Sequence, residues 1–443
     1  MAKKPSPKPV PVLFQKLEKH FGCDPGELPL IERSFEKYER PNLHQALEEI
    51  GGKSGTWHGM VSLQSYNTSS LAKLSRVSSA SQFDAGPVQH VDEVLPGNQR
   101  LACVKRGMKL CQYRGVPVAI HLDEERFTST PGIQLEVMAA DREVAEELMR
   151  RIESVTAFGK SFRGGVISMA GDCYRGFALK FHQLPQVQRE EVILPEEVLQ
   201  RIERHTVGFS QQAQRLKAAG RHLKRGLLFH GPPGTGKTFS AMYLASRMPE
   251  RTVFILTGGS MGMIEKAVAM ARVLQPATLI LEDVDLIGTE RENQTVGANA
   301  VLFELLNQMD GLADDADLLF ILTTNRPDVL EPALASRPGR VDQAILIPPP
   351  DEDCRRRLFE LYGKGLKIET KKLGGLIKRL EGVSAAFIRE LLRKAAVHAA
   401  LETPKGKIAV KPQHLEAAVA ELMVAGGELT MSLLGVAGKD GGV

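Results

Sequence analysis

The feature that most constrains this chain is a glycine-rich loop, GPPGTGKT, at residues 231–238. It fits the phosphate-loop pattern GxxxxGK[ST] at every position. An apolar segment at 226–229 precedes the loop, and a segment of helical composition at 239–245 follows it. This strand–loop–helix context is the one that the pattern requires, so it argues against a chance glycine-rich turn. The sequence therefore predicts a phosphate-binding loop in an α/β domain.

The residue types in this loop suit the phosphates of a nucleotide. Glycines let backbone N–H groups curl around phosphate oxygens with no Cβ in the way, and the helix N-terminus adds a partial positive charge. Lys237 is placed to reach the β- and γ-phosphates, and the Thr238 hydroxyl can coordinate Mg²⁺. We therefore expect ATP and Mg²⁺ as ligands. The candidate binding residues are Gly231, Pro232, Pro233, Gly234, Thr235, Gly236, Lys237 and Thr238.

Two carboxylates follow an apolar strand, at Glu282 and Asp283. One acid at such a strand tip can hold the Mg²⁺ shell while the next polarises the attacking water. The alternative is a surface turn with paired carboxylates, but a buried strand that delivers both acids beside the phosphate loop argues against it. Asp285 is a third acid nearby, for which a helix-cap role and a functional role are equally open.

A second apolar strand, 318–322, ends in the polar run Thr323-Thr324-Asn325. Asn325 could hold the attacking water between itself and Asp283. Further on, Arg337 and Arg340 flank a Pro-Gly turn. Arginine stabilises charge on a transferring phosphoryl group. Taken alone, a salt-bridged loop explains these two arginines better.

Together these segments resemble the AAA family of ATPases in the AAA+ superfamily, over about residues 190–424. By position the resemblance makes Glu282 the Mg²⁺-supporting acid, Asp283 the catalytic base and Asn325 the sensor 1 residue. It also implies that Arg337 and Arg340 are arginine fingers that act on a neighbouring subunit's nucleotide. The motifs that carry it are GPPGTGKT at 231–238 (Walker A), LILEDVD at 279–285 (Walker B), LTTNRPDVLEP at 322–332 (sensor 1) and RPGRVD at 337–342.

The resemblance implies two further contacts with the adenine. Gly382–Phe387 is similar to the sensor 2 stretch, where small residues approach the base, and Val207-Gly208 is similar to the adenine-contacting loop before Walker A. The chain departs from the family pattern at three places. The acids stand as Glu-Asp where most members have Asp-Glu, one extra residue precedes Arg337, and the aromatic pore loop is replaced by TGGSMGM at 257–263. Either a methionine of this segment grips substrate, or the segment is a plain turn.

The expected fold class is α/β: a P-loop NTPase core with a parallel sheet and a C-terminal helical lid, preceded by an α+β N-terminal domain. The predicted core strands are 226–229, 253–256, 278–281, 318–323 and 343–347, and the predicted lid helices are 351–362, 384–402 and 413–424. The expected domains are a flexible basic and proline-rich tail, short helices and a Ser/Gly-rich loop (1–100), the α+β N-terminal domain (101–183), the AAA ATPase large α/β domain (184–350), the helical lid (351–425) and a Gly-rich tail (426–443).

Composition narrows the function. The formal net charge of +4 over 443 residues is too small to imply a polyanionic partner. No basic stripe with interleaved aromatics supports nucleic-acid binding, and Arg355–Arg357 is interpreted as a solvated helix face. Five cysteines form no CxxC pair, and no apolar run reaches the roughly 20 residues of a transmembrane helix. We expect a cytoplasmic protein.

The leading hypothesis is an ATP-hydrolysing ring, a homo-hexamer that remodels an unidentified protein partner, since trans-acting arginines make hydrolysis depend on assembly. The alternative is a nucleotide-gated scaffold or adaptor with slow hydrolysis, which the missing pore aromatic and the swapped acids favour. The N-terminal domain shows no catalytic constellation in the sequence, and a docking or oligomer-spacing role is the preferred interpretation of it.

Overall fold

The chain divides into two compact units, Met1–His182 and Gln183–Val443. The structure is a computed structural model, and the residues it describes are 10–51, 55–63, 69–124, 132–157, 159–172, 176–285, 304–309, 311, 316–328, 330, 341–368, 373–402 and 406–424.

A seven-stranded antiparallel sheet forms the centre of the first unit, in the order β1-β7-β6-β5-β2-β3 with β4 also paired to β5. Its strands are β1 (Leu30–Phe35), β2 (Thr56–Ser62), β3 (Phe83–Gly86), β4 (Gln89–Leu95), β5 (Gln99–Tyr113), β6 (Val116–Glu124) and β7 (Ile133–Ala139). An antiparallel hairpin follows in the chain, β8 (Val166–Asp172) and β9 (Gly176–His182).

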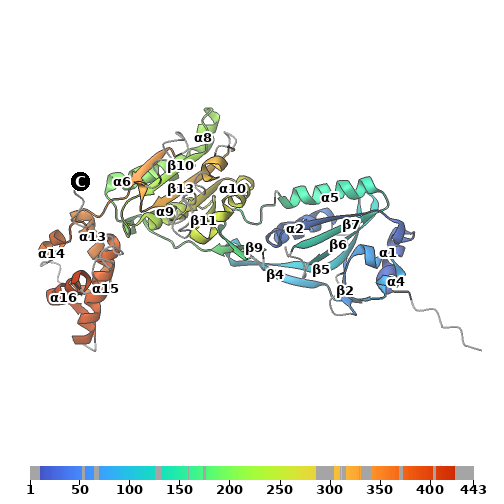
Figure 1. Ribbon diagram of the computed structural model, residues 1–443, viewed down its shortest axis with the longest axis horizontal. Helices are drawn as coiled ribbons and strands as arrows, with labels where there is room; N and C mark the ends of the chain where they lie inside the picture. Colours follow the sequence, from blue (N-terminus) through green and yellow to red (C-terminus); the bar gives the residue numbers. More distant parts are fainter. Residues whose placement is uncertain are drawn as a thin grey trace, which may run out of the picture. The chain divides into compact units, whose positions relative to one another are not determined.

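Helices cover both faces of this sheet. Neighbouring strand residues point to opposite faces, so Ile120 joins a core with α2 and α5 while Ala119 joins a second core with α1 and α3. α2 and α5 lie side by side along the first face (Figure 1). The helices are α1 (Val12–Phe21), α2 (Arg40–Gly51), α3 (Leu71–Leu74), α4 (Val77–Ala80) and α5 (Arg142–Ala157).

The Ser/Gly-rich loop predicted within residues 1–100 was expected to occupy residues 51–100. That prediction is wrong where the structure describes this segment, because β2, β3 and β4 lie within it. β1 was likewise not predicted. Exposed and part-buried positions alternate along most of β4, and both sets include polar residues, so the composition resembles that of a loop. Gly59 is not a turn residue: a Cβ there would lie 2.1 Å from the Pro87 carbonyl, so glycine permits close backbone packing.

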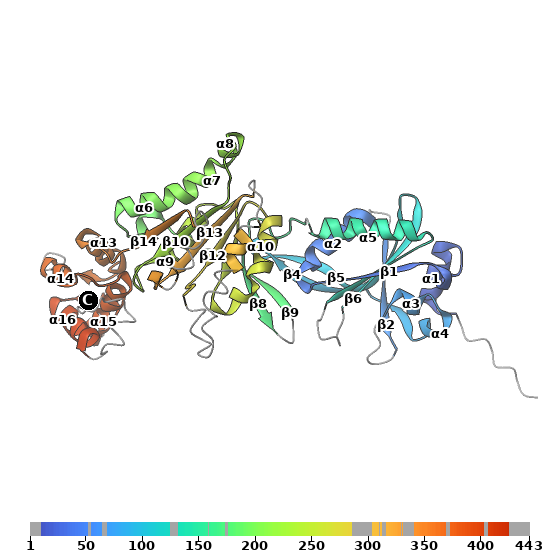
Figure 2. The ribbon, with the colours of Figure 1, turned by 45° about the horizontal axis from the view of Figure 1, so that its top comes forward.

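Parallel strands of the second unit pair in the order β14-β10-β13-β12-β11 (Figure 2). They are β10 (Arg225–His230), β11 (Thr252–Leu256), β12 (Ala277–Leu281), β13 (Leu318–Thr324) and β14 (Gln343–Leu346). All five predicted core strands are confirmed. β12 and β13 are buried at every residue, as expected of parallel strands covered on both faces.

The connections of this sheet decide where a ligand can bind. The chain crosses from β10 to β11 through α9 (Lys237–Ser246) and returns to β12 through α10 (Ile264–Val273). The two crossovers run in opposite directions, so right-handedness places these helices on opposite faces. Ligands bind beyond the carboxyl ends of two neighbouring strands whose connections leave in opposite directions. In this sheet these strands are β10, whose connection leads toward β11, and β13, whose connection leads to β14. The preceding helical elements are α6 (Glu196–Glu203), the π-turn η5 (Arg204–Gly208), α7 (Phe209–Gln211) and α8 (Ala213–Ala218).

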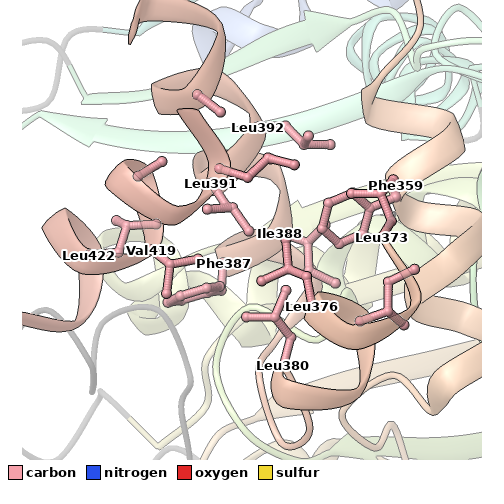
Figure 3. Close-up of a cluster of buried hydrophobic side chains, with 14 of the residues drawn as sticks. Phe359, Leu373, Leu376, Leu380, Phe387, Ile388, Leu391, Leu392, Val419 and Leu422 are labelled. Carbon is pink, nitrogen blue, oxygen red and sulfur yellow. The ribbon is translucent and has the colours of Figure 1, made fainter. Parts of the chain in front are cut away.

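The C-terminal lid has its own apolar core, and its three predicted helices are confirmed (Figure 3). It contains α13 (Glu352–Tyr362), β15 (Lys367–Ile368), α14 (Gly374–Arg379), α15 (Ala385–Glu402), β16 (Ala409–Val410) and α16 (Pro412–Val424). Arg355 is not part of a solvated face. It is buried and donates to the carbonyls of Ile377 (2.8 Å) and Pro350 (2.7 Å). No helix in the described part of the chain is both long and apolar enough to cross a bilayer.

Candidate active site

The loop between β10 and α9 is a cradle that only glycine can form. Gly231, Gly234 and Gly236 have φ values of 140°, 73° and 103°. A Cβ at Gly231 would lie 2.4 Å from the Ile347 carbonyl oxygen, and one at Gly234 would lie 2.8 Å from Ala386 Cβ. The backbone therefore adopts conformations with positive φ that glycine tolerates, and there is no room for a side chain at Gly231 or Gly234. This geometry fits a phosphate-binding loop.

Lys237 is directed back into this loop. Its Nζ donates to the carbonyl oxygens of Gly231 and Pro232, each at 2.8 Å. Burial lowers the pKa of Lys237 from its usual 10.5, and the nearby carboxylates of Asp283 and Asp285 oppose that shift. The cation and the two acids therefore act on one another across the phosphate-loop edge of the sheet. The fold thus brings together the two strongest motifs of the sequence.

The strand register brings Asp283 to the end of β13. The β12–β13 pairing stops at Leu281 opposite Leu322, so β13 continues past the end of β12. Asp283 has φ 48°, a left-handed conformation that is uncommon for residues other than glycine. Its backbone N–H donates to Thr323 Oγ1 at 3.0 Å, and Asn325 Nδ2 donates to its Oδ1 at 3.3 Å. The predicted pair of base and sensor is therefore in contact.

Asp285, the third acid after β12, is buried. Its Oδ1 accepts hydrogen bonds from Thr324 Oγ1 at 2.8 Å and from the backbone N–H of Asn325 at 3.2 Å. Thr324 Oγ1 in turn accepts from the Arg326 N–H at 3.0 Å. Sequence reasoning recognised the polar run at the end of β13 but gave no role to its threonines. The signal that could have identified them is the length of β13, which exceeds that of β12.

The Glu282 carboxylate is the part of the site that calls for a cation. Its Oε1 is buried and has no hydrogen-bond partner among the described residues. Burial, and then the neighbouring Asp283, raise the pKa of Glu282, and burial and Asp285 raise that of Asp283. A divalent cation would relieve this repulsion, and Mg²⁺ commonly uses one or two carboxylates together with phosphate oxygens. No cluster in the described residues could hold a metal by protein side chains alone.

The lid reaches the phosphate loop through the predicted sensor 2 stretch. The Ala386 backbone N–H donates to the Gly234 carbonyl oxygen at 3.1 Å. A Cβ at Gly234 would lie 2.8 Å from Ser384 Oγ, so the lid lies in van der Waals range of the cradle. Ile193, in the segment before α6, packs against the lid core. Sequence reasoning missed Ile193 because the contact depends on the position of the lid.

Val207 and Gly208 do not form a loop, contrary to the expectation. They lie in η5, within an uninterrupted helical run from Glu196 to Gln211. Within this run, Thr206 Oγ1 donates to the Ile202 carbonyl oxygen at 2.6 Å and does not cap a new helix start. Both residues line a pocket of about 450 Å³, together with Arg189, Gln200, Glu203, Arg204, Gln211, Tyr243 and Arg247.

Two further expectations concern loops. Arg337 and Arg340 lie outside the described residues. The segment in the place of a pore loop is a 3₁₀ helix, η6 (Gly258–Met263), closed by a capping box between Thr257 and Ser260. Met261 is only 1% exposed, so it is a core residue and cannot grip a substrate; Met263 is part-buried.

A family model described as "ATPase family associated with various cellular activities (AAA)" matches residues 227–349. The chain is 34% identical over 188 residues to "26S proteasome regulatory subunit 10B homolog A" of Arabidopsis thaliana, which covers 40% of this chain and 47% of that protein. It is 30% identical over 225 residues to "26S proteasome regulatory subunit 8 homolog" of Schizosaccharomyces pombe. That alignment covers 47% of this chain and 54% of the relative.

A third relative is "ATP-dependent zinc metalloprotease FtsH" of Thermus thermophilus, 31% identical over 283 residues, which covers 60% of this chain and 44% of that protein. The chain spans about half the length of the curated relatives it matches. The similarity to all three is therefore a similarity over part of each protein.

Proposed function

We propose that this protein, whose residues 227–349 match the family model of the AAA ATPases, binds ATP with Mg²⁺ and hydrolyses it to ADP and phosphate. The observation that supports this best is the meeting of Lys237, Asp283 and Asn325 at one edge of the parallel sheet. Binding and water activation use different groups there, as phosphoryl transfer requires.

Each group of the site has a role in this proposal. The cradle at 231–236 supplies backbone N–H groups, and Lys237 balances charge on the β- and γ-phosphates. Thr238 and Glu282 would hold Mg²⁺, which when bound neutralises charge on the phosphate oxygens. Asp283 takes the proton of the attacking water, and Asn325 orients that water against Asp283.

We also propose that the active form is a homo-hexamer in the cytoplasm and that it remodels a protein partner. Head-to-tail interfaces that close give rings, and Arg337 and Arg340 complete a neighbour's site in this proposal. The zinc-protease chemistry that one relative's name describes is not proposed for these residues, since the sequence has no His-Glu-x-x-His motif.

One observation favours a second candidate, a nucleotide-gated scaffold with slow hydrolysis. The segment at 257–263 lacks an aromatic residue and buries Met261, so it is poorly suited to pulling a chain through a pore. Addition of candidate protein partners distinguishes the two functions. A remodelling enzyme raises its rate of phosphate release when a partner is present. A scaffold binds the partner, but its rate of phosphate release does not change.

The ATPase proposal is tested by Lys237→Ala. Removal of the ammonium group should abolish most ATP affinity and with it the release of phosphate, because the Lys237 ammonium is directed into the loop. Calorimetric titration with ATP·Mg²⁺ and a phosphate-release assay measure both effects. An unchanged dissociation constant would show that the loop is not the nucleotide site.

A further inference from the structure

We propose that Thr323 and Asp285 are positioning residues, which together hold the Asp283 carboxylate against the Asn325 amide. The proposal rests on the proposed ATPase function, because the reaction is the one that Asp283 and Asn325 would carry out. It goes beyond that function by assigning roles to two side chains outside the proposed catalytic set.

The first arm of the device fixes the backbone of Asp283. Thr323 accepts two hydrogen bonds from the residues that follow β12. Its Oγ1 accepts from the Asp283 N–H at 3.0 Å, and its carbonyl oxygen accepts from the Val284 N–H at 3.0 Å. These bonds hold Asp283 at φ 48°. A left-handed aspartate is strained and persists only where surrounding contacts dictate it.

The second arm fixes Asn325. The buried Asp285 carboxylate accepts from Thr324 Oγ1 and from the Asn325 N–H through the same oxygen, Oδ1. The side chain of Asn325 is thereby held at the end of β13, where its Nδ2 donates to Asp283 Oδ1. The two arms leave from consecutive residues of one rigid strand, so they set the separation of base and sensor.

The swapped acids explain why such a device is useful here. Aspartate is one methylene shorter than the glutamate that most AAA proteins place at the second position of Walker B, so its carboxylate reaches less far from the backbone. A left-handed turn at the strand tip redirects the Cα–Cβ bond and can bring a short side chain to the sensor. Misplacement of a reacting group by about 1 Å can cost about 100-fold in rate, so loss of either arm should be costly.

The experiment compares isosteric and conservative variants of Thr323 in the full chain. Thr323→Val keeps the volume but removes the acceptor for the Asp283 N–H, and Thr323→Ser keeps the hydroxyl. We expect Thr323→Val to lower kcat by about 10- to 100-fold, with KM for ATP within about 3-fold of wild type. Thr323→Ser should retain most of kcat. Equal activity of wild type and Thr323→Val, or equal loss in both variants, would overturn the proposal.

Asp285 provides an independent test should Thr323→Val fail to fold. Asp285→Asn keeps an oxygen that can accept from Thr324 and Asn325, whereas Asp285→Ala keeps none. We expect kcat to fall by about 10-fold or more in Asp285→Ala and to stay within about 3-fold of wild type in Asp285→Asn, again at similar KM. Wild-type kcat in Asp285→Ala, or an equal fall in both variants, would refute the positioning role.

Lys237→Ala separates this proposal from the function on which it rests. If wild type releases phosphate and Lys237→Ala does not, the ATPase function holds, and the threonine and aspartate variants then judge the device alone. If wild type shows no phosphate release that depends on Lys237, the proposed function itself has failed.

Discussion

At the scale of single residues, the order of the two acids after β12 sets the chemistry. Glu282 Oε1 is buried and has no hydrogen-bond partner among the described residues, whereas Asp283 Oδ1 accepts a hydrogen bond from the Asn325 amide. The pKa of each carboxyl group is raised, in part by a neighbouring acid, so the two share one negatively charged environment. Their hydrogen-bond surroundings nevertheless differ, as the separate roles proposed for them in metal binding and water activation would require.

Substitution of each acid by its amide should therefore give different defects. Asp283→Asn should bind ATP normally but lower kcat by about 10²–10⁴-fold, because the general base is lost. Glu282→Gln should instead raise the Mg²⁺ concentration that gives half-maximal activity. Phosphate release measured across a Mg²⁺ series distinguishes them. A fully active Asp283→Asn together with an inactive Glu282→Gln would mean that the roles are reversed.

At the scale of elements, a buried arginine holds the amino ends of the parallel strands together. Arg251, at 2% exposure, donates to Thr278 Oγ1 at 3.0 Å and to the Ala277 carbonyl oxygen at 2.6 Å, and pairs with Asp317 Oδ1 at 2.7 Å. β11, β12 and β13 all begin beside these contacts. Burial lowers the pKa of Arg251, while Asp317 opposes that shift.

Arg251→Ala should lower the free energy of unfolding by about 3–5 kcal/mol, because it leaves Asp317 and buried carbonyl groups without their partner. Urea denaturation of the full chain measures the change. Arg379→Ala is the matched control, since Arg379 forms an exposed pair with Glu416 in the lid and should contribute far less. Equal losses in the two variants would argue against a special role for Arg251.

The sequence predicted the elements of the second unit because its signals are local. Strands such as β13 are continuous apolar runs, and the phosphate loop is specified by glycines that the backbone needs. That Asp283 lies near Asn325 could also be predicted, since both follow parallel strands at one sheet edge, but their direct hydrogen bond was not expected. What the sequence could not show depends on partners distant along the chain, such as the anchoring of Asn325 by Asp285 and the burial of Arg355.

At the scale of the whole molecule, the proposed trans-acting arginines make activity a property of the assembly. Specific activity should rise steeply with protein concentration and then reach a plateau, because a comparable arginine contributes about 10³–10⁵ in rate only once a neighbour supplies it. Arg337→Ala should bind ATP nearly normally and lose hydrolysis. Concentration series of wild type and variant measure this.

A mixing experiment tests the trans arrangement directly. An Arg337→Ala subunit keeps its phosphate loop, and an Asp283→Asn subunit keeps its arginines, so one complete site forms where the second abuts the first. The mixture should regain activity that neither variant shows alone. If native mass spectrometry detects mixed assemblies and the mixture stays inactive, Arg337 does not act on a neighbour.

The meeting of lid and cradle has a mechanical consequence. α15 begins at Ala385, beside the Gly234 contact, and its 18 residues extend for about 27 Å. A rotation of about 10° at its first turn would move its far end by about 5 Å, given that length. A small change in the proposed phosphate loop would thereby be converted into a displacement large enough to break or make a protein contact at the far end of α15.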